Sequence, residues 1–314
     1  MIVCCGEALI DFIPTPDGTG YRPCPGGSIL NIAVGLGRLG TPVGFLSRLS
    51  TDIFGTQLAK HMLKDGVNLD TCPRVEGQTT LAFVSLNQDG SVEPQYAFYA
   101  TGAVDRDITI SDLPDALDET IQAMHFGSIS MVLEPGASTF EHLLQRESEK
   151  RIISLDPNVR PGLIQDQSVY QERFANWMHF VDILKLSQAD FSYIYPGKKI
   201  DNFLEEWFAQ GVRMVILTEG SKGSRGFLQG GVDVFIAAPR VTVKDTVGAG
   251  DSFFSAVLAY LYTNQKLHAK DSISGLTAGE TKECLRFASK AAAINCTREG
   301  ADPPYRHEME EIES

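Results

Sequence analysis

The segment Asp245-Thr246-Val247-Gly248-Ala249-Gly250-Asp251-Ser252-Phe253-Phe254 joins a polar loop to an apolar, helical run that continues to Tyr262. The glycines on either side of Ala249 let backbone N–H groups approach a ligand closely. The first N–H groups of a helix lack partners within the helix and carry the positive end of its dipole, so this turn should attract an anion. Asp251 places a carboxylate inside the turn. A base beside a phosphate cradle indicates phosphoryl transfer, although an acid in the first turn also simply complements the helix dipole.

Composition narrows the class of protein. With 314 residues, 43% hydrophobic and 21% charged, the chain suits one large α/β domain with an appendage, or two domains. Its net charge of −13 argues against nucleic acid and against an anionic membrane surface as partners. Any phosphate ligand would then need local positive charge from helix N-termini, a few Lys or Arg side chains, or a metal ion.

Cysteine usage and the first residues indicate a reduced, cytoplasmic setting. No C-x-x-C pair occurs and no His lies at ligand spacing from a Cys, so we expect core thiols and no zinc site. Glu7 and Asp11 interrupt the first apolar run, and the first basic residue is Arg22, which argues against a signal peptide. No apolar stretch is long enough to span a bilayer.

Short apolar runs alternate with runs of helical spacing. Helices are predicted over Ile29–Leu39, Phe54–Leu63 and Phe203–Phe208, besides the one that begins near Asp251. This alternation predicts a mostly parallel sheet covered on both faces. Buried strands are predicted at Ile2–Cys5, Val43–Leu46, Ala123–Phe126, Arg151–Leu155, Ile183–Leu186 and Met214–Leu217.

One region departs from this alternation. Thr80–Asn87 and Glu93–Tyr99 alternate in polarity and are joined by Gln88-Asp89-Gly90-Ser91, a hairpin signal. The Pro- and Gly-containing loop Pro14–Pro25 could join them. We predict a small inserted sheet, a candidate lid, with Tyr96 and Phe98 on one face.

Polar residues follow several predicted strands, where open α/β sheets form their ligand crevice. Gly127-Ser128, Asp156–Arg160, Ser187–Asp190 and Thr218–Gly223 take such positions. Asp156 and Asp190 could support Mg²⁺, directly or through water. Asp156-Pro157-Asn158 is also typical of a simple turn.

Two familiar nucleotide motifs do not fit. Gly35-Leu36-Gly37-Arg38-Leu39-Gly40 spells G-x-G-x-x-G, but it ends a helical run instead of following a strand. We expect its glycines to allow close packing and to form the helix C-cap. No Gly-Lys is followed by Ser or Thr, which argues against a P-loop kinase.

The N-terminal region carries a second polar constellation. Asp11 follows the first strand region, and Pro25-Gly26-Gly27-Ser28-Ile29-Leu30-Asn31 opens a helix after a diglycine. Asp11 and Asn31 are suited to bind hydroxyl groups, while glycines admit a ligand close to the backbone. Taken alone, the same residues also fit an exposed acid and an ordinary first helical turn.

Together, Pro25–Gly40 and Asp245–Phe254 resemble the paired signatures of the PfkB, or ribokinase-like, sugar kinases. The resemblance covers essentially the whole chain. It implies one domain over residues 1–314, a three-layer α/β/α ribokinase-like sandwich with a mostly parallel central sheet. It also implies a small β-sheet lid from segments near 12–25 and 79–105. ATP would be the phosphoryl donor and Mg²⁺ the cofactor.

The resemblance also implies roles for single residues. Asp251 would be the catalytic base, and the amides of Gly248, Ala249 and Gly250 the anion hole. The sugar would be bound by Asp11, Gly26, Gly27, Asn31, Phe98 and Arg160, and the nucleotide by Ser187, Thr218, Gly220, Gly223 and Asn295. Asp190 would face Mg²⁺ through water, and the carbonyls of Asp245 and Val247, with the loop Arg298–Pro304, match a monovalent-cation site for K⁺.

Two departures weaken parts of this assignment. Ser187 and Asp190 replace the Asn-x-x-Glu metal motif, and their shorter reach argues against direct metal contact. The loop end Ala301-Asp302-Pro303-Pro304 lacks the hydroxyl residue common in ribokinases, which leaves K⁺ activation open.

Within the family, the segments Gly6–Pro14 and Tyr21–Gly27 look most like bacterial fructokinases. This implies D-fructose as acceptor, with ribokinase, 2-keto-3-deoxygluconate kinase and nucleoside kinase as alternatives. A dinucleotide-dependent oxidoreductase is disfavoured because the required ribose-binding acid is matched only by Asp65, inside a helical run. A non-catalytic sugar-binding module is disfavoured by the intact Gly-Ala-Gly-Asp. The expected partners are a sugar and ATP, with a homodimer through the lid.

Overall fold

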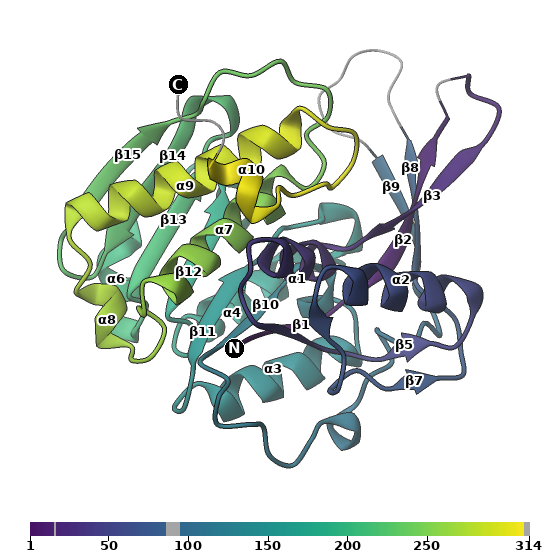
Figure 1. The fold of residues 1–314 in the computed structure, drawn as a ribbon. Helices are drawn as coiled ribbons and strands as arrows, with labels where there is room; N and C mark the ends of the chain where they lie inside the picture. The colour runs from purple at the N-terminus through teal and green to yellow at the C-terminus, as the bar shows by residue number, and fades with distance from the viewer. Residues whose placement is uncertain (16, 86–94, 311–314) are drawn as a thin grey trace.

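A nine-stranded sheet forms the centre of the molecule (Figure 1). The computed structural model describes residues 1–15, 17–85 and 95–310. The strand order is β15-β14-β13-β12-β11-β10-β1-β4-β6, parallel from β6 to β13 and antiparallel at β14 and β15. The strands are β1 (Ile2–Cys5), β4 (Val43–Leu46), β6 (Val67–Asn68), β10 (Ala123–Gly127), β11 (Ile152–Asp156), β12 (Ile183–Ser187), β13 (Met214–Thr218), β14 (Gly223–Leu228) and β15 (Asp233–Ala237).

Helices cover both faces, as the buried strands require. Side chains alternate between two cores along each strand: Ile2 and Cys4 join one core, Val3 and Cys5 the other. The first core packs against α1 (Ser28–Arg38), α2 (Ile53–Lys64), α7 (Ala249–Thr263), α8 (Asp271–Ser274), α9 (Ala278–Cys296) and α10 (Arg306–Glu310). The second packs against α3 (Gly136–Glu147), α4 (Gln167–Trp177), α5 (Gln188–Ile194) and α6 (Leu204–Gln210). The predicted three-layer α/β fold and all six predicted strands are confirmed.

A second sheet of four strands rises from one edge of the first (Figure 1). Its order is β3 (Tyr21–Gly26), β2 (Leu9–Pro14), β8 (Leu81–Ser85) and β9 (Gln95–Tyr99). The segment Pro14–Pro25 joins this sheet, as predicted, but Tyr21–Gly26 within it is an antiparallel strand paired with β2 and not a loop. Pro23 and Pro25 are tolerated because β3 is an edge strand. The predicted turn at Gln88–Ser91 lies outside the described residues. A short pair, β5 (Leu49–Ser50) and β7 (Arg74–Val75), completes the sheets.

The G-x-G-x-x-G segment ends α1, as predicted. Gly40 adopts φ +77°, and the Thr41 N–H donates to the Leu36 carbonyl, a typical helix C-terminus. A Cβ on Gly35 would lie 2.3 Å from Ser255 Oγ, so this glycine lets α1 approach α7. The G-x-G-x-x-G pattern therefore does not form the strand-to-helix turn of a dinucleotide-binding site. Among the described residues, no helix combines the length and apolarity needed to cross a bilayer.

Candidate active site

A cavity of about 1050 Å³ lies between the carboxyl ends of the central strands and the inner face of the second sheet. It is lined by the link from β1 into β2, by the first turns of α1 and α7, by β9, and by the segments that follow β11 and β12. These elements come from every third of the chain. The expected crevice at the strand ends is therefore present, and the second sheet forms one of its walls.

Asp251 stands in the first turn of α7 and is 8% exposed. Its Oδ1 accepts a hydrogen bond from Ser28 Oγ at 2.7 Å, and its Oδ2 accepts one from Asn31 Nδ2 at 2.8 Å. Both donors belong to α1. The two signature segments, some 220 residues apart in sequence, thus meet at this one carboxylate. The position of this carboxylate is fixed by two hydrogen bonds from another helix. An acid that only complemented the dipole of its own helix would not need these bonds.

The turn before Asp251 is shaped by its neighbours. Gly248 caps α7 in the left-handed region, with φ +72°, and a Cβ there would lie 2.5 Å from Ala301 Cβ. Gly248 and Gly250 line the cavity, so their backbone faces the space where a ligand would lie. Ala249, which begins the helix, is not among the lining residues; its N–H donates to the Thr246 carbonyl. The geometry fits an anion at a helix N-terminus.

Asp11 lies on β2 and faces the cavity. A Cβ on Gly26 would lie 2.0 Å from Asp11 Oδ2, so Gly26, buried and outside the lining, makes room for this carboxylate. Burial raises the pKa of Asp11 to about 7, against the opposing pull of the Arg160 guanidinium and with a further rise from Asp251. Arg160 and Phe98 also line the cavity.

Aromatic side chains of β9 close the opposite wall. Tyr96 and Phe98 share the inner face, as the period of two predicts, and their rings stack at 5.8 Å. The Arg160 guanidinium lies 5.7 Å from the centre of the Tyr96 ring. Apolar rings beside a carboxylate and a guanidinium suit a small polyol, whose C–H and O–H groups need both kinds of contact.

Glu7 lines the cavity, and the sequence interpretation did not include it. Ser130 Oγ donates to its carboxylate, and a Cβ on Gly27, whose φ is +101°, would lie 3.1 Å from Glu7 Cγ. Burial raises the pKa of Glu7 to about 7, although hydrogen bonds from Ser130 oppose the rise. An acid at the end of an otherwise apolar strand was the available signal.

Lys185 is the second cavity residue that the sequence interpretation missed. It is buried in β12, and its Nζ donates to Asp156 Oδ2 at 2.6 Å. Desolvation opposes its charge, but Asp156 and Asp190 outweigh desolvation and raise the pKa of the ammonium group. A single lysine inside the apolar run Ile183–Leu186 was the signal in the sequence.

Ser187 and Asp190 line the cavity, and both are engaged with the protein. Asp190 Oδ2 accepts from the Ser187 N–H at 2.8 Å and from Ser187 Oγ at 2.6 Å, forming a capping box at the start of α5. Its Oδ1 accepts from the Val159 N–H at 2.8 Å. Among the described residues no group of three or more His, Cys, Asp or Glu side chains could hold a metal. Direct metal coordination by Asp190 therefore fits poorly.

Asp156 behaves as the turn interpretation predicted. Its Oδ1 accepts from the Asn158 N–H at 3.2 Å, and Asn158 takes φ +37°. Its other oxygen carries the ion pair to Lys185. Both carboxylate oxygens thus have partners within the protein, and a metal ion would have to share Asp156 with Lys185.

Three expected nucleotide-binding residues are not among those that line the cavity: Thr218, Gly220 and Gly223. Thr218 ends β13 and pairs in register with Ser187 at the end of β12, so the two strand ends are adjacent. Gly220 is exposed in the turn that follows. The shared sheet edge is consistent with a ligand that extends from the cavity over β13, and the three roles stay predictions.

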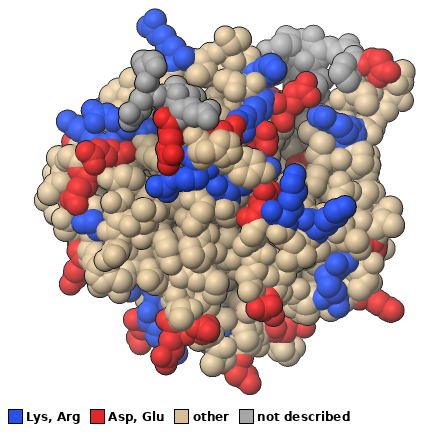
Figure 2. Space-filling model, in the orientation of Figure 1, with Lys and Arg blue, Asp and Glu red and all other residues tan. Residues whose placement is uncertain are grey.

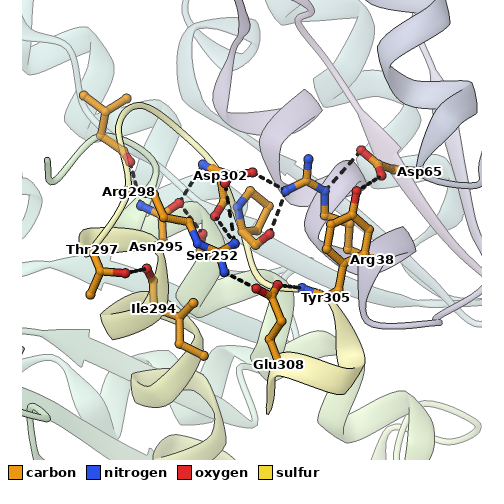
Figure 3. Close-up of polar contacts among 12 residues, drawn as sticks. Arg38, Asp65, Ser252, Ile294, Asn295, Thr297, Arg298, Asp302, Tyr305 and Glu308 are labelled. Atoms are coloured by element: carbon orange, nitrogen blue, oxygen red, sulfur yellow. Dashed lines mark hydrogen bonds and ion pairs between the residues drawn. The ribbon is translucent and has the colours of Figure 1, made fainter. Parts of the chain in front are cut away.

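Asn295 is fully buried in α9, and its amide is used within the protein (Figure 3). Its Nδ2 donates to the Val247 carbonyl at 2.8 Å, while its Oδ1 accepts from Ser252 Oγ at 3.1 Å and from the Asp302 N–H at 2.9 Å. Asn295 therefore ties α9 to the turn before Asp251. Its expected contact with the nucleotide stays a prediction. The hydrogen bonds that the side chain makes hold the Val247 turn and the Asp302 loop in place.

The loop Arg298–Pro304 is fixed by Asp245 on one side and by Arg38 on the other, and Figure 3 shows the Arg38 side. Asp245 Oδ2 accepts from the Gly300 N–H at 2.8 Å, and its Oδ1 accepts from the Val247 N–H at 3.0 Å. Arg38, from α1, donates to Asp302 Oδ1 at 2.5 Å and pairs with Asp65 Oδ2 at 3.1 Å. The loop that packs against Gly248 is thus bound to α1 by a guanidinium between two carboxylates.

Charge on the face shown in Figure 2 is mixed: Lys and Arg side chains stand beside Asp and Glu side chains and form no continuous basic field there. At the cavity, the positive charge is supplied by side chains of the lining itself. Among the described lining residues, Lys185 and Arg160 are the cationic side chains, facing the carboxylates of Glu7, Asp11, Asp190 and Asp251.

Residues 1–308 match the pfkB family of carbohydrate kinases. A fructokinase from Rhizobium leguminosarum bv. trifolii is 39% identical over 264 residues, which cover 83% of this chain and 79% of that protein. The probable fructokinase-4 of Arabidopsis thaliana is 31% identical, with 99% of this chain and 95% of that protein covered.

Solved structures agree on the fold. The fructokinase from Xylella fastidiosa with bound ATP superposes with a TM-score of 0.89 at 26% identity, over 98% of this chain and 96% of its own. The fructokinase from Vibrio cholerae O395 with bound fructose, ADP and calcium ion has a TM-score of 0.85 at 22% identity, over 100% and 98%. The chain belongs to the pfkB family of carbohydrate kinases, and the predicted family and phosphotransferase activity on a sugar hydroxyl are confirmed.

Proposed function

We propose that this carbohydrate kinase transfers the γ-phosphoryl group of Mg-ATP to D-fructose, giving fructose 6-phosphate and ADP. The observation that carries the proposal is the buried Asp251 carboxylate, held by α1 at the N-terminus of α7 and open to the cavity. It places a base and an anion-attracting turn within the same first helical turn. Fructose as acceptor is supported by the identity to the R. leguminosarum fructokinase.

Asp251 serves in this proposal as the general base. The sugar hydroxyl oxygen bonds to the γ-phosphorus, the bond from that phosphorus to the bridging oxygen of ADP breaks, and the hydroxyl proton passes to Asp251. Ser28 and Asn31 orient the carboxylate. The amides of Gly248 and Gly250 and the helix dipole stabilise the charge on the transferring group, while the Ala249 N–H would join them only by leaving the Thr246 carbonyl.

The sugar lies between the second sheet and α1 in this proposal. Asp11 and Asn31 bind its hydroxyls, Gly26 and Gly27 leave space, and Arg160 and Phe98 flank it. A neutral sugar suits this wall, because the carboxylate of a sugar acid would meet Asp11. Closure of the β9 aromatic side chains over the sugar would exclude water, which competes with the sugar as phosphoryl acceptor.

The nucleotide extends from the cavity over the ends of β12 and β13, past Ser187, Thr218, Gly220 and Gly223, with Asn295 behind. Mg²⁺ would be held near Asp190 through water, since the Asp190 oxygens already accept three bonds. It would neutralise phosphate charge. A monovalent cation such as K⁺ at Asp245 and Val247 would share the Val247 carbonyl with Asn295.

A homodimer through the second sheet is also proposed. The outer face of that sheet carries Phe12, Tyr21, Phe83 and Tyr99, with the Phe83 ring 4.7 Å from Phe12, 5.3 Å from Tyr21 and 5.5 Å from Tyr99. Tyr21 and Tyr99 are 51% and 64% exposed. An exposed aromatic cluster beside edge strands favours association with a second copy.

Substrate preference is the first test. With Mg-ATP saturating, a coupled ADP-release assay should give a kcat/KM for fructose at least about tenfold above those for ribose and 2-keto-3-deoxygluconate, about 1.4 kcal/mol of differential transition-state binding. Preference for ribose, a nucleoside or the sugar acid would refute fructose as substrate and leave the kinase chemistry untouched.

Replacement of the base is the second test. Asp251→Asn should still bind ATP but lose about a hundred- to ten-thousandfold in kcat, because the proton acceptor is gone while the shape remains. Asp115→Asn, at an exposed position, is the control. More than a tenth of the wild-type kcat in Asp251→Asn would show that another group takes the proton.

Acid pH should weaken sugar binding. Because burial raises the pKa of Asp11 to about 7, the hydroxyl-accepting carboxylate is present above pH 7 and is lost as the pH falls through it. The KM for fructose should therefore rise between pH 8 and pH 6. Asp11→Asn should raise this KM about ten- to a hundredfold, the usual range for a hydrogen bond to a charged group, and flatten its pH dependence. An equal rise in the KM for ATP would place Asp11 elsewhere.

Mass in solution tests the dimer. Tyr99→Glu should shift the light-scattering mass from two copies toward one, because a charge would be buried in the aromatic interface. Val169→Glu, on the comparably exposed surface of α4, should leave the mass unchanged. A wild-type protein that is monomeric at micromolar concentration contradicts the interface.

A further inference from the structure

Lys185 occupies an unusual place for a lysine. It is 4% exposed, in the middle of the parallel strand β12, where the neighbouring positions Ile183, Leu184 and Leu186 are apolar and fully buried. Lysine is almost never fully buried unless it is paired. Its aliphatic stem fills a core position, while its ammonium group reaches the lining of the cavity. A purely structural role for a charge would not require access to that cavity.

The ammonium group of Lys185 is bound to Asp156 on the side away from the cavity and faces the cavity on the other side. Asp156, which is 1% exposed and not among the lining residues, accepts from Lys185 Nζ at 2.6 Å. Asp156 is the hydrogen-bond partner that the described residues provide. Since an ammonium group carries three N–H donors, two remain for the cavity side.

The turn before Asp251 lies directly beside this ammonium group. A Cβ built on Gly250 would lie 3.2 Å from Lys185 Nζ, so the ammonium group touches the space next to the Gly250 backbone. Gly250 does not take a left-handed φ. Its backbone conformation therefore does not demand glycine, and the approach of Lys185 supplies a reason for the missing side chain.

Charge balance at the cavity points the same way. The wall carries the carboxylates of Glu7, Asp11, Asp190 and Asp251, and the chain as a whole has a net charge of −13. Arg160, the other cation of the described lining, is turned toward its own loop and toward Tyr96. Of the two cations of the described lining, Lys185 is therefore the one whose charged group lies against the turn.

We propose that Lys185 is a further catalytic residue, whose ammonium group contacts the phosphoryl group as it transfers at the Gly248–Gly250 turn. The inference rests on the proposed function, in which ATP is the donor. Lys185 stays protonated throughout and exchanges no proton, while Asp251 takes the hydroxyl proton. Its fixed positive charge, preorganised by Asp156 in a site of low dielectric, offsets the negative charge that builds up on the phosphoryl oxygens.

Lys185→Met tests the contact, since methionine keeps the apolar stem and removes the charge. It leaves the buried Asp156 carboxylate without its ion-pair partner, and an uncompensated buried charge destabilises proteins strongly. The double variant Lys185→Met with Asp156→Asn removes both charges and serves as the folding-competent form. Lys60→Met, at an exposed site on α2, is the matched control. Thermal unfolding of all four proteins reports on the fold.

Calorimetric titration with adenosine, ADP and ATP separates a phosphate contact from a structural effect. Both Lys185 variants should bind adenosine like the wild type, within about twofold, and bind ATP at least about tenfold more weakly, with ADP between them. Their kcat should fall by about a hundred- to a thousandfold, as for loss of one oxyanion donor. Fructose affinity measured without nucleotide should not change.

Three outcomes overturn the inference. ATP affinity and kcat that recover in the double variant would show that Lys185 only compensates Asp156. A loss of fructose affinity with unchanged ATP affinity would make Lys185 a sugar-binding residue. Equal losses for adenosine and ATP would remove the phosphate contact. The nucleotide titrations do not depend on the sugar, so a failure of fructose as substrate is recognised separately by the absence of fructose-dependent ADP release from the wild type.

Discussion

The burial of one carboxylate organises this molecule. Asp251 is withdrawn from water at the start of α7, and a buried charge is tolerated only where hydrogen-bond donors replace the lost water. Ser28 and Asn31 provide those donors from the first turn of α1. Both helices must therefore begin at the same cavity edge. Gly35 permits the close contact of α1 with α7 that this arrangement requires.

The same requirement extends outward from the site. The turn before Asp251 is held by Asn295, and the loop that packs on Gly248 is held by Arg38 between Asp65 and Asp302. A helix N-terminus attracts an anion most effectively when its amides cannot relax away from it. These buried and half-buried contacts keep the amides in place before any ligand arrives, so the cost of ordering the turn is met during folding.

Sequence reasoning reached what depends on local pattern. The buried strands follow from apolar runs such as Val43–Leu46, and the helix at Asp251 follows from its glycines and apolar periodicity. It placed the segment near 12–25 in the second sheet but took Tyr21–Gly26 for a loop, because prolines that suggest a loop are also compatible with an edge strand, and edge position is a property of the whole sheet. Lys185 and Glu7 escaped for a related reason. Their partners, Asp156 and Ser130, lie 29 and 123 residues away in the sequence, and no local sequence pattern predicts contacts over such separations.

The residues proposed for phosphoryl transfer and those proposed for sugar choice are distributed differently along the chain. The turn to which we assign the phosphate is one continuous segment, Asp245–Asp251, so the sequence alone could suggest this role. The wall to which we assign the sugar is assembled from Asp11 on β2, Phe98 on β9 and Arg160 after β11, three segments that only the folded sheets bring together. Their spacing depends on how the second sheet sits over the first. A small shift of that sheet would change which sugar fits while leaving Asp251 and its donors in place, which explains physically how one phosphoryl-transfer site can serve different sugars within a family.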